Sequence, residues 1–278
     1  MELWMTEFQT KNLGLTARVK ETLFTGKSDF QDVVIVDTEQ FGRMLVLDGV
    51  FQTCIFDEFI YHEMIAHVPL FVHPNPKSVL VIGGGDGGTI REVVKHPSVV
   101  NAEMVEIDGM VVEASKKHLP EIAEALINNH PKVQLKIDDG IKHMQEARNK
   151  YDVIIVDCSD PIGPGEGLFT HAFYEDVYKA LKEDGLFVQQ TESPFYHQPL
   201  VSHLYKDIGS LFPITKLYLA QIPLYPSGTH CFTIGSKKYD PSSVDTAKLP
   251  QVGTTRYWNK DIQKSCFALP NFVQDLLK

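Results

Sequence analysis

The sequence predicts an α/β fold, in which a small antiparallel β domain precedes a larger domain built on a mostly parallel sheet. Between residues 16 and 55, β-branched and aromatic segments are broken by Gly26, Gly42 and Gly49, which is typical of strands joined by turns. From residue 78 onward, apolar segments of strand length alternate with segments of helical spacing, which is typical of a parallel sheet covered by helices. The chain has 278 residues and is 43% hydrophobic, so it can bury a full core.

A helix is expected at 57–72, where apolar residues recur at helical spacing. The sequence HPNPK at 73–77 ends this helix, because its prolines cannot continue the helical hydrogen bonds. We therefore divide the chain into an N-terminal β domain with a linking helix, residues 1–72, and a second domain, residues 73–278.

The second domain is expected to contain five strand and helix pairs. These pairs lie at 78–82 with 89–96, 102–108 with 109–119, 133–137 with 140–150, 151–157 with 173–183, and 185–190 with 200–212. Two more apolar segments, at 214–223 and 231–236, are close enough in sequence to pair as an antiparallel hairpin at the edge of the sheet.

Charge and cysteine content exclude several classes of protein. A net charge of −10 argues against the basic surface that nucleic-acid binding needs, and it is compatible with a cationic substrate. We expect a cytoplasmic protein, because the N-terminus lacks the apolar core of a signal peptide and no segment approaches the roughly 18 apolar residues of a membrane span. The cysteines lie far apart and are expected to be reduced thiols: Cys54, Cys158, Cys231 and Cys266. No metal site is expected, since the histidines of HEMIAH at 62–67 are five residues apart instead of four.

A glycine-rich segment, VLVIGGGDGGTIR at 79–91, joins an expected strand to a helix in the manner of a nucleotide or nucleoside site. The N–H groups at such a helix start favour an anion, so the carboxylate of Asp86 is unexpected there. More carboxylates follow the next strands: Glu106 and Asp108, Asp138 and Asp139, and Asp157 and Asp160. Any one of them could cap the following helix. Their clustering at the strand ends, where ligands of such sheets bind, indicates a cationic ligand, because unpaired carboxylates repel one another.

Several longer motifs resemble those of the spermidine synthase family of aminopropyltransferases. They are FQD (30–32), LVLDGVFQ (45–52), DEFIYHEMIAH (57–67), HPNPKSVLVIGGGDGGTIREVVKHPSV (73–99), VEID (105–108), DDG (138–140), DCSDPIGP (157–164) and IPLYPSG (222–228). The resemblance implies a methyltransferase-like Rossmann domain after the β domain, and a homodimer or homotetramer. It also implies transfer of the aminopropyl group of decarboxylated S-adenosylmethionine to putrescine, which yields spermidine and methylthioadenosine. The donor is then a co-substrate, and no cofactor is expected.

The resemblance also implies a role for individual residues. The donor-binding residues would be Gln31, Asp86, Glu106, Asp139, Gly140 and Pro164. The putrescine-binding residues would be Tyr61, His62, Asp86, Asp157, Asp160 and Tyr225. Among these, Glu106 would bind the ribose hydroxyls, Asp139 the adenine amino group, and Asp157 would be the catalytic base. Two positions depart from the family pattern: Cys158 replaces a common serine, and His62 stands where some members have glutamine.

This interpretation explains the carboxylate of Asp86, because the decarboxylated donor ends in a bare ammonium that a carboxylate can bind. The main alternative is an amine N-methyltransferase that uses intact S-adenosylmethionine, whose own carboxylate Asp86 would repel. An NAD-dependent dehydrogenase would place Asp86 against a pyrophosphate. A noncatalytic binding module would not need carboxylates at every strand end. The acceptor range, the subunit count, a lid role for 159–171 and the role of Cys158 stay open at this stage.

Overall fold

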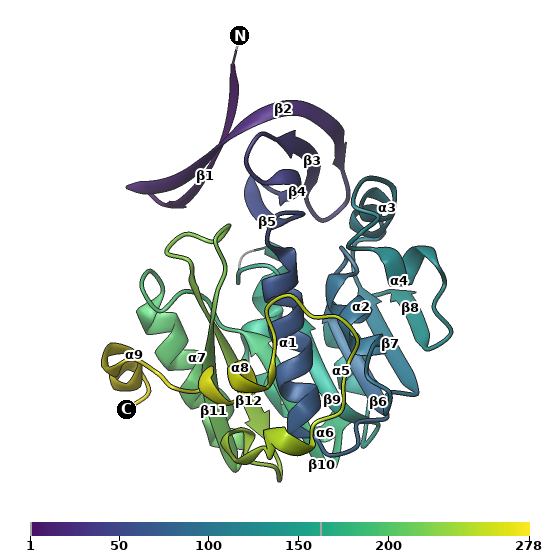
Figure 1. Cartoon of the computed structure of the whole chain (residues 1–278), viewed down its shortest axis with the longest axis vertical. Coiled ribbons are helices and arrows are strands. Elements are labelled where there is room, and N and C mark those ends of the chain that lie inside the picture. Colours follow the sequence, from purple (N-terminus) through teal and green to yellow (C-terminus); the bar gives the residue numbers. More distant parts are fainter. Residues whose placement is uncertain (1, 162) are drawn as a thin grey trace.

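The computed structural model describes residues 2–161 and 163–278 and consists of two sheets, one above the other in the view of Figure 1. The N-terminal sheet is antiparallel throughout, with its strands in sequence order. Its strands are β1 (Leu3–Thr10), β2 (Leu13–Lys27), β3 (Asp32–Thr38), β4 (Gly42–Leu47) and β5 (Val50–Cys54). The antiparallel β domain is therefore confirmed, but it begins earlier than the pattern indicated, because β1 precedes the first expected strand.

The second sheet has seven strands in the order β11-β12-β10-β9-β6-β7-β8. The neighbours from β10 to β8 pair in parallel, whereas β12 is antiparallel to both β10 and β11. The strands are β6 (Ser78–Gly83), β7 (Asn101–Glu106), β8 (Val133–Ile137), β9 (Tyr151–Asp157), β10 (Leu181–Gln190), β11 (Ile214–Gln221) and β12 (Thr229–Ser236). The predicted mostly parallel sheet with a C-terminal antiparallel hairpin at its edge is confirmed.

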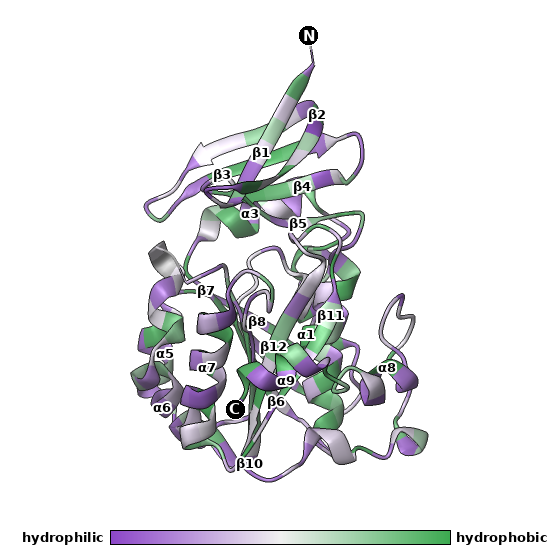
Figure 2. Cartoon of the chain, turned by 90° about the vertical axis from the view of Figure 1, so that its left-hand side faces the viewer, coloured by the Kyte–Doolittle hydropathy of each residue, from purple (hydrophilic) through white to green (hydrophobic). Residues whose placement is uncertain are grey.

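Helices cover both faces of this sheet. They are α1 (Glu58–Val72), α2 (Gly88–Val94), α3 (Gly109–His118), α4 (Glu124–Ile127), α5 (Gly140–Glu146), α6 (His171–Ala180), α7 (Gln198–Leu211), α8 (Lys260–Ser265) and α9 (Asn271–Leu276). Val79 and Val81 of β6 pack in one core with α1 and α2, while Leu80 and Ile82 pack in another with α5, α6 and α7. Figure 2 shows the resulting arrangement, with hydrophobic strands between helices that turn polar residues outward. Because both faces are buried, these strands are apolar throughout.

Helix α1 is buried on nearly every side, and only Phe59 within it is partly exposed. It packs against α2 and against the strands β9, β10 and β11 of the larger sheet. Its Glu63 accepts hydrogen bonds of 2.7–2.8 Å from the backbone N–H groups of residues 256–258, which ties the C-terminal segment to this helix. The division of the chain at residue 72 stays a prediction.

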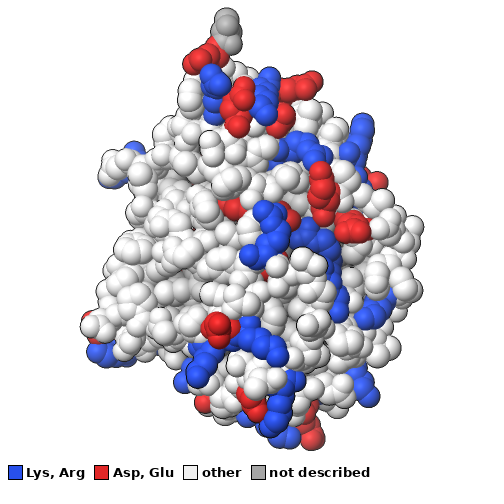
Figure 3. All heavy atoms as spheres, in the orientation of Figure 1, with Lys and Arg blue, Asp and Glu red and all other residues white. Residues whose placement is uncertain are grey.

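Two further sequence expectations concern membranes and thiols. Within residues 2–161 and 163–278, every helix is too short or too polar to cross a bilayer. All four cysteines are free, and three of them are buried. On the face drawn in Figure 3, Lys and Arg side chains are interspersed with Asp and Glu and do not form a continuous basic surface.

Candidate active site

A cleft of about 940 Å³ lies where the carboxyl ends of β6, β7 and β9 face the N-terminal sheet. Gln31, Leu45 and Gln52 of the smaller domain line it on one side, and the glycine-rich loop lines it on the other. Its lining combines apolar side chains with a few carboxylates and backbone groups, as in small-molecule sites. The cleft therefore lies where open α/β sheets bind their ligands.

The glycine-rich loop runs directly against Asp157. Gly83 and Gly84 have positive φ angles of 78° and 69°, and the N–H of Gly84 donates to the backbone oxygen of Asp157 at 2.8 Å. A Cβ atom on Gly83 would lie 2.1 Å from that oxygen, and one on Gly85 would lie 3.1 Å from Oε2 of Glu106. Glycine is thus required here both for its backbone conformation and for the close approach of two acidic residues.

Both carboxylate oxygens of Asp157 accept hydrogen bonds. The hydroxyl of Tyr61 donates to Oδ1 at 2.8 Å, and Oγ1 of Thr89 donates to Oδ2 at 2.7 Å. Burial raises the pKa of Asp157, and the negative charge of Asp86 raises it further, although the charge of His62 and both hydroxyl groups act in the opposite direction. Asp157 is therefore held in a fixed orientation and is a stronger base than a free carboxylate. Thr89 was not among the predicted residues, although it is the second residue of α2, the helix that follows the glycine loop.

Asp86 lies in the same cleft, beside His62. Its Oδ1 accepts the N–H of Gly88 at 2.7 Å and lies 3.4 Å from Nε2 of His62. Burial acts to raise the pKa of Asp86, but His62, the N–H of Gly88 and the charge of Arg91 together outweigh this effect, and the pKa is lowered. Asp86 is therefore ionised, and one of its oxygens is occupied by the N–H of Gly88, the first residue of α2.

The predicted donor residues line the other end of the cleft. Oε1 of Glu106 accepts the N–H of Asp108 at 2.8 Å, and burial raises the pKa of Glu106 to about 7. Oδ1 of Asp139 accepts the N–H of Ile141 at 2.9 Å and so caps α5. One oxygen of this carboxylate therefore has the capping role that the sequence left open. Gln31 crosses between the domains and donates from Nε2 to Oδ2 of Asp108 at 2.9 Å. Gly140 also lines the cleft, whereas the side chain of Pro164 lies outside the described part of the chain.

A second chamber of about 490 Å³ opens on the far side of Tyr61 and Tyr225, which line both spaces. Asp160 lies in this second chamber and not in the first. Two further buried carboxylates share it: Glu7 from β1, and Glu192 from just beyond the end of β10. Burial and the charge of Glu192 raise the pKa of Asp160 to about 8. Neither glutamate was predicted from the sequence, although Glu192 also follows a strand end.

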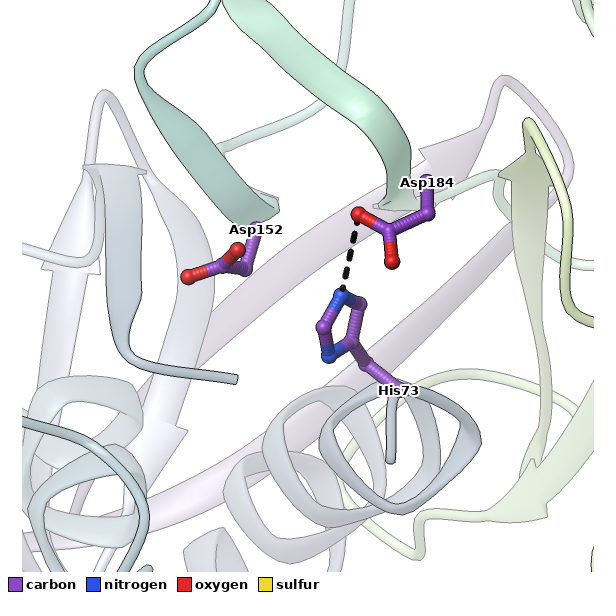
Figure 4. A group of neighbouring side chains, drawn as sticks. All are labelled: His73, Asp152 and Asp184. Carbon is purple, nitrogen blue, oxygen red and sulfur yellow. Dashed lines mark ion pairs between the residues drawn. The ribbon is translucent and has the colours of Figure 1, made fainter. Parts of the chain in front are cut away.

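A separate group of possible metal ligands lies at the opposite end of β9 (Figure 4). His73, Asp152 and Asp184 have ligand atoms within 4.8 Å of one another. However, Nδ1 of His73 accepts the N–H of Asn75, so the proton of the neutral ring lies on Nε2, 3.8 Å from Asp184. Asp152 already accepts from Lys182 at 2.9 Å and from two backbone N–H groups at the start of β6. We therefore interpret this group as a support for the start of β9 and not as a metal centre.

Fold and cleft together define a class of protein: an α/β enzyme of the nucleoside-binding type, with an acidic chamber suited to an amine beside the nucleoside cleft. Family comparisons agree with this class. Residues 58–247 match the spermine/spermidine synthase domain, and residues 3–54 match the spermidine synthase tetramerisation domain. The second match indicates that the chain forms a homo-oligomer.

Individual relatives are similar over almost the full length. The polyamine aminopropyltransferase of Caldicellulosiruptor saccharolyticus is 57% identical over 100% of this chain and 99% of its own. The crystal structure of spermidine synthase from Thermotoga maritima is 41% identical, with a TM-score of 0.92 over 99% of this chain and 94% of that chain. A spermidine synthase solved with the transition-state analogue AdoDATO is 43% identical, with a TM-score of 0.96 over the same shares. This chain belongs to the spermidine synthase family of polyamine aminopropyltransferases.

Proposed function

We propose that this chain transfers the aminopropyl group of decarboxylated S-adenosylmethionine to putrescine at Asp157. The observation that supports this most is the pair of adjoining chambers that share Tyr61 and Tyr225 in their linings. One chamber has a glycine loop and strand-end carboxylates suited to a nucleoside, and the other has three carboxylates suited to a diamine. A displacement reaction needs its two substrates to meet in this way.

The donor would occupy the cleft of the glycine-rich loop. We assign the ribose hydroxyls to Glu106 and the adenine amino group to the second oxygen of Asp139. Gly140 and Pro164 would contact the donor beside them. Gln31 would contact the donor with the amide oxygen that its bond to Asp108 leaves free. The donor's ammonium would bind Asp86.

Putrescine would occupy the second chamber. We assign its distal ammonium to Asp160, since this carboxylate lies on the far side of the two tyrosines from Asp157. The hydroxyl of Tyr225 donates to the backbone oxygen of Gln52 at 2.9 Å, which leaves its oxygen to accept from an amine. Tyr61 donates to Asp157 and can accept in the same way. His62 would complete the amine site beside Asp86.

The reaction begins with a proton transfer. Alkyl amines titrate near pH 10, so the attacking nitrogen of putrescine carries a proton at neutral pH and must lose it to act as a nucleophile. Asp157 accepts this proton. The freed lone pair attacks the propyl carbon next to the sulfonium, the carbon–sulfur bond breaks, and its electron pair stays on sulfur, which leaves as the neutral thioether of methylthioadenosine.

Asp86 supports this function over amine N-methylation. Intact S-adenosylmethionine would bring its carboxylate beside Asp86, whereas the decarboxylated donor brings an ammonium. The test is to incubate the protein with decarboxylated S-adenosylmethionine and a panel of diamines and to identify the products by mass. Spermidine and methylthioadenosine are expected. Methylated amines from intact S-adenosylmethionine in comparable yield would contradict the proposal.

Assembly and location complete the proposal. We infer that the homo-oligomer is a dimer or tetramer whose contacts include the hairpin of β1 and β2, because this hairpin exposes Leu3, Trp4 and Phe8. The four free cysteines support a reducing, cytoplasmic location.

A further inference from the structure

The imidazole of His62 lies between two carboxylates. Its Nδ1 is 2.5 Å from Oε2 of Glu58, and its Nε2 is 3.4 Å from Oδ1 of Asp86. The side chain is only 2% exposed, so water cannot replace either partner. A neutral imidazole has one N–H and one lone pair, and in this position the lone pair would face a carboxylate. The geometry is satisfied only when both nitrogens carry protons.

Glu58 is itself held by Arg91 of α2. The guanidinium donates from Nη1 to Oε1 of Glu58 at 3.1 Å and from Nη2 to Oε2 at 2.8 Å. Arg91 also bonds Oε1 of Glu92 at 2.8 Å and the backbone oxygen of Glu121 at 2.9 Å. A bidentate pair of this kind fixes direction as well as charge. Glu58 therefore cannot turn away from His62.

Gly88, the first residue of α2, fixes the imidazole from the other side. A Cβ atom on Gly88 would lie 2.2 Å from Cε1 of His62, so the ring packs directly on the helix backbone. The N–H of Gly88 donates to Oδ1 of Asp86, the same oxygen that faces His62. Within the described residues no hydrogen bond or ion pair involves Oδ2 of Asp86, which leaves this oxygen for a ligand.

The charges that act on His62 come from two helices, one strand and the glycine loop. Glu58 lies on α1 and Arg91 on α2, Asp86 lies in the glycine loop, and Asp157 ends β9. The phenol of Tyr61 stands edge-on to the imidazole at 5.5 Å between ring centroids. Burial acts to lower the pKa of His62, but Asp86 and then Glu58 outweigh it and raise this pKa to about 10. The electrostatics agree with the geometry.

We propose that Glu58 and Arg91 are positioning residues that keep His62 a doubly protonated imidazolium, which holds one oxygen of Asp86 and presents the other to the ammonium of the donor. This rests on the proposed function of Asp86. In the order Arg91, Glu58, His62 and Asp86, the four side chains form a row of alternating positive and negative charges whose net charge is zero. The row therefore keeps the same charge throughout the range in which free histidine titrates, so these four side chains add no pH dependence to donor binding there.

The first test measures the protonation state of His62 without substrate. The ¹⁵N shifts of the imidazole, assigned by the signal lost in His62→Gln, should show two protonated nitrogens from about pH 6 to about pH 9. A ring that is neutral at pH 7 would overturn the proposal. Because no reaction is involved, this result is independent of whether the proposed aminopropyl transfer occurs.

The second test is Glu58→Gln. Loss of this charge should move the titration of His62 below about pH 9, so that the ring becomes neutral as pH rises. The KM for the donor should then stay near the unmodified value at about pH 6.5 and rise about tenfold by about pH 9, with kcat changed by less than about threefold. In a His62→Gln background the same substitution should have little effect on KM, because the residue acts through His62.

Glu103→Gln is the matched control. Glu103 is also buried and paired with lysines, at 2.7 Å to Lys150, but it lies on β7 outside both chambers. This control should lower thermal stability and leave the titration of His62 and the KM profile unchanged. An equal KM profile for Glu58→Gln and Glu103→Gln would reduce Glu58 to a structural role and overturn the proposal.

Discussion

Replacing Asp157 with asparagine should separate its chemical role from its structural one. Asparagine has the same shape, but its amide cannot accept a proton from putrescine. Loss of a positioned general base costs 10² or more in kcat, about 2.7 kcal/mol at 1.36 kcal/mol per tenfold. We expect a reduction of at least this size with little change in the affinity for the donor.

The structural cost of the same substitution can be worked from two hydrogen bonds. Asp157 accepts from Tyr61 and from Thr89, whereas asparagine offers one acceptor oxygen and turns an NH₂ group toward the other hydroxyl. A hydroxyl can rotate to accept instead, and removal of a buried charge offsets part of the loss. The net effect on the free energy of unfolding should therefore stay within about 1–3 kcal/mol.

Rapid-quench measurement of a single turnover at saturating substrate is the assay, because it reports the chemical step apart from product release. Asp152→Asn is the matched control: it changes a buried aspartate at the other end of β9, outside both chambers. It should leave the rate of the chemical step unchanged. For the unmodified enzyme, kcat/KM should rise with pH through the raised pKa of Asp157, and this rise should be lost in Asp157→Asn. A rate within tenfold of the unmodified enzyme would refute the assignment of Asp157 as base.

Other consequences concern the charged groups and the exposed hairpin. Ionised Asp160 binds the distal ammonium best, and burial and Glu192 raise its pKa to about 8, so the KM for putrescine should fall as pH rises from about 6.5 to about 8.5. Asp160→Asn should raise this KM about tenfold and flatten its pH profile in steady-state assays; an unchanged profile would place the distal ammonium elsewhere. Asp86→Asn should reduce a preference of at least about 10² for the decarboxylated donor, mainly by weakening that donor, when aminopropyl and methyl transfer are scored side by side. Burial raises the pKa of Glu106 to about 7, so folding favours its protonated form, and the ligand-free protein should lose roughly 2–3 kcal/mol of stability as pH rises from about 4.5 through 7. Thermal melts of Glu106→Gln should lack that part of the pH dependence, and identical curves would contradict this assignment. Trp4→Asp, at a side chain 54% exposed on β1, should shift the homo-oligomer to a smaller species by light scattering, and an unchanged mass would remove β1 from the interface.

Most of the fold could be predicted because its pattern is regular. Strands β6 to β10 are apolar throughout and are separated by amphipathic helices, so length and periodicity suffice to find them. Strand β1 was not predicted because it reverses the usual pattern of buried apolar and exposed polar residues. Glu7 is 5% exposed, whereas the neighbouring Phe8 is 75% exposed. The reason for this inversion is that Glu7 lines the second chamber, while Phe8 belongs to the exposed hairpin. The helices α8 and α9 have six residues each, too few for a helical period to be recognised.

The candidate site was predictable to the extent that it follows strand ends. Glu106, Asp139 and Asp157 all lie where the sequence places them, because the carboxyl ends of neighbouring parallel strands meet at one edge. Thr89 and Arg91 could not be assigned, since their roles depend on which side of α2 faces Asp157 and α1. Glu7 comes from the other domain, and no local pattern connects it with this sheet.

Asp86 and Asp157 differ in the groups that lie beside their carboxylates. Asp86 lies 3.4 Å from Nε2 of His62, whereas the two oxygens of Asp157 accept hydrogen bonds from neutral hydroxyl groups. Asp157 therefore has the raised pKa and Asp86 the lowered one. In the proposed binding mode, a bound donor would add the positive charge of its sulfonium next to Asp157, and this charge would lower the pKa of Asp157. We therefore expect Asp157 to be fully ionised once the donor is bound, so that the base is ready when the diamine enters from the acidic chamber.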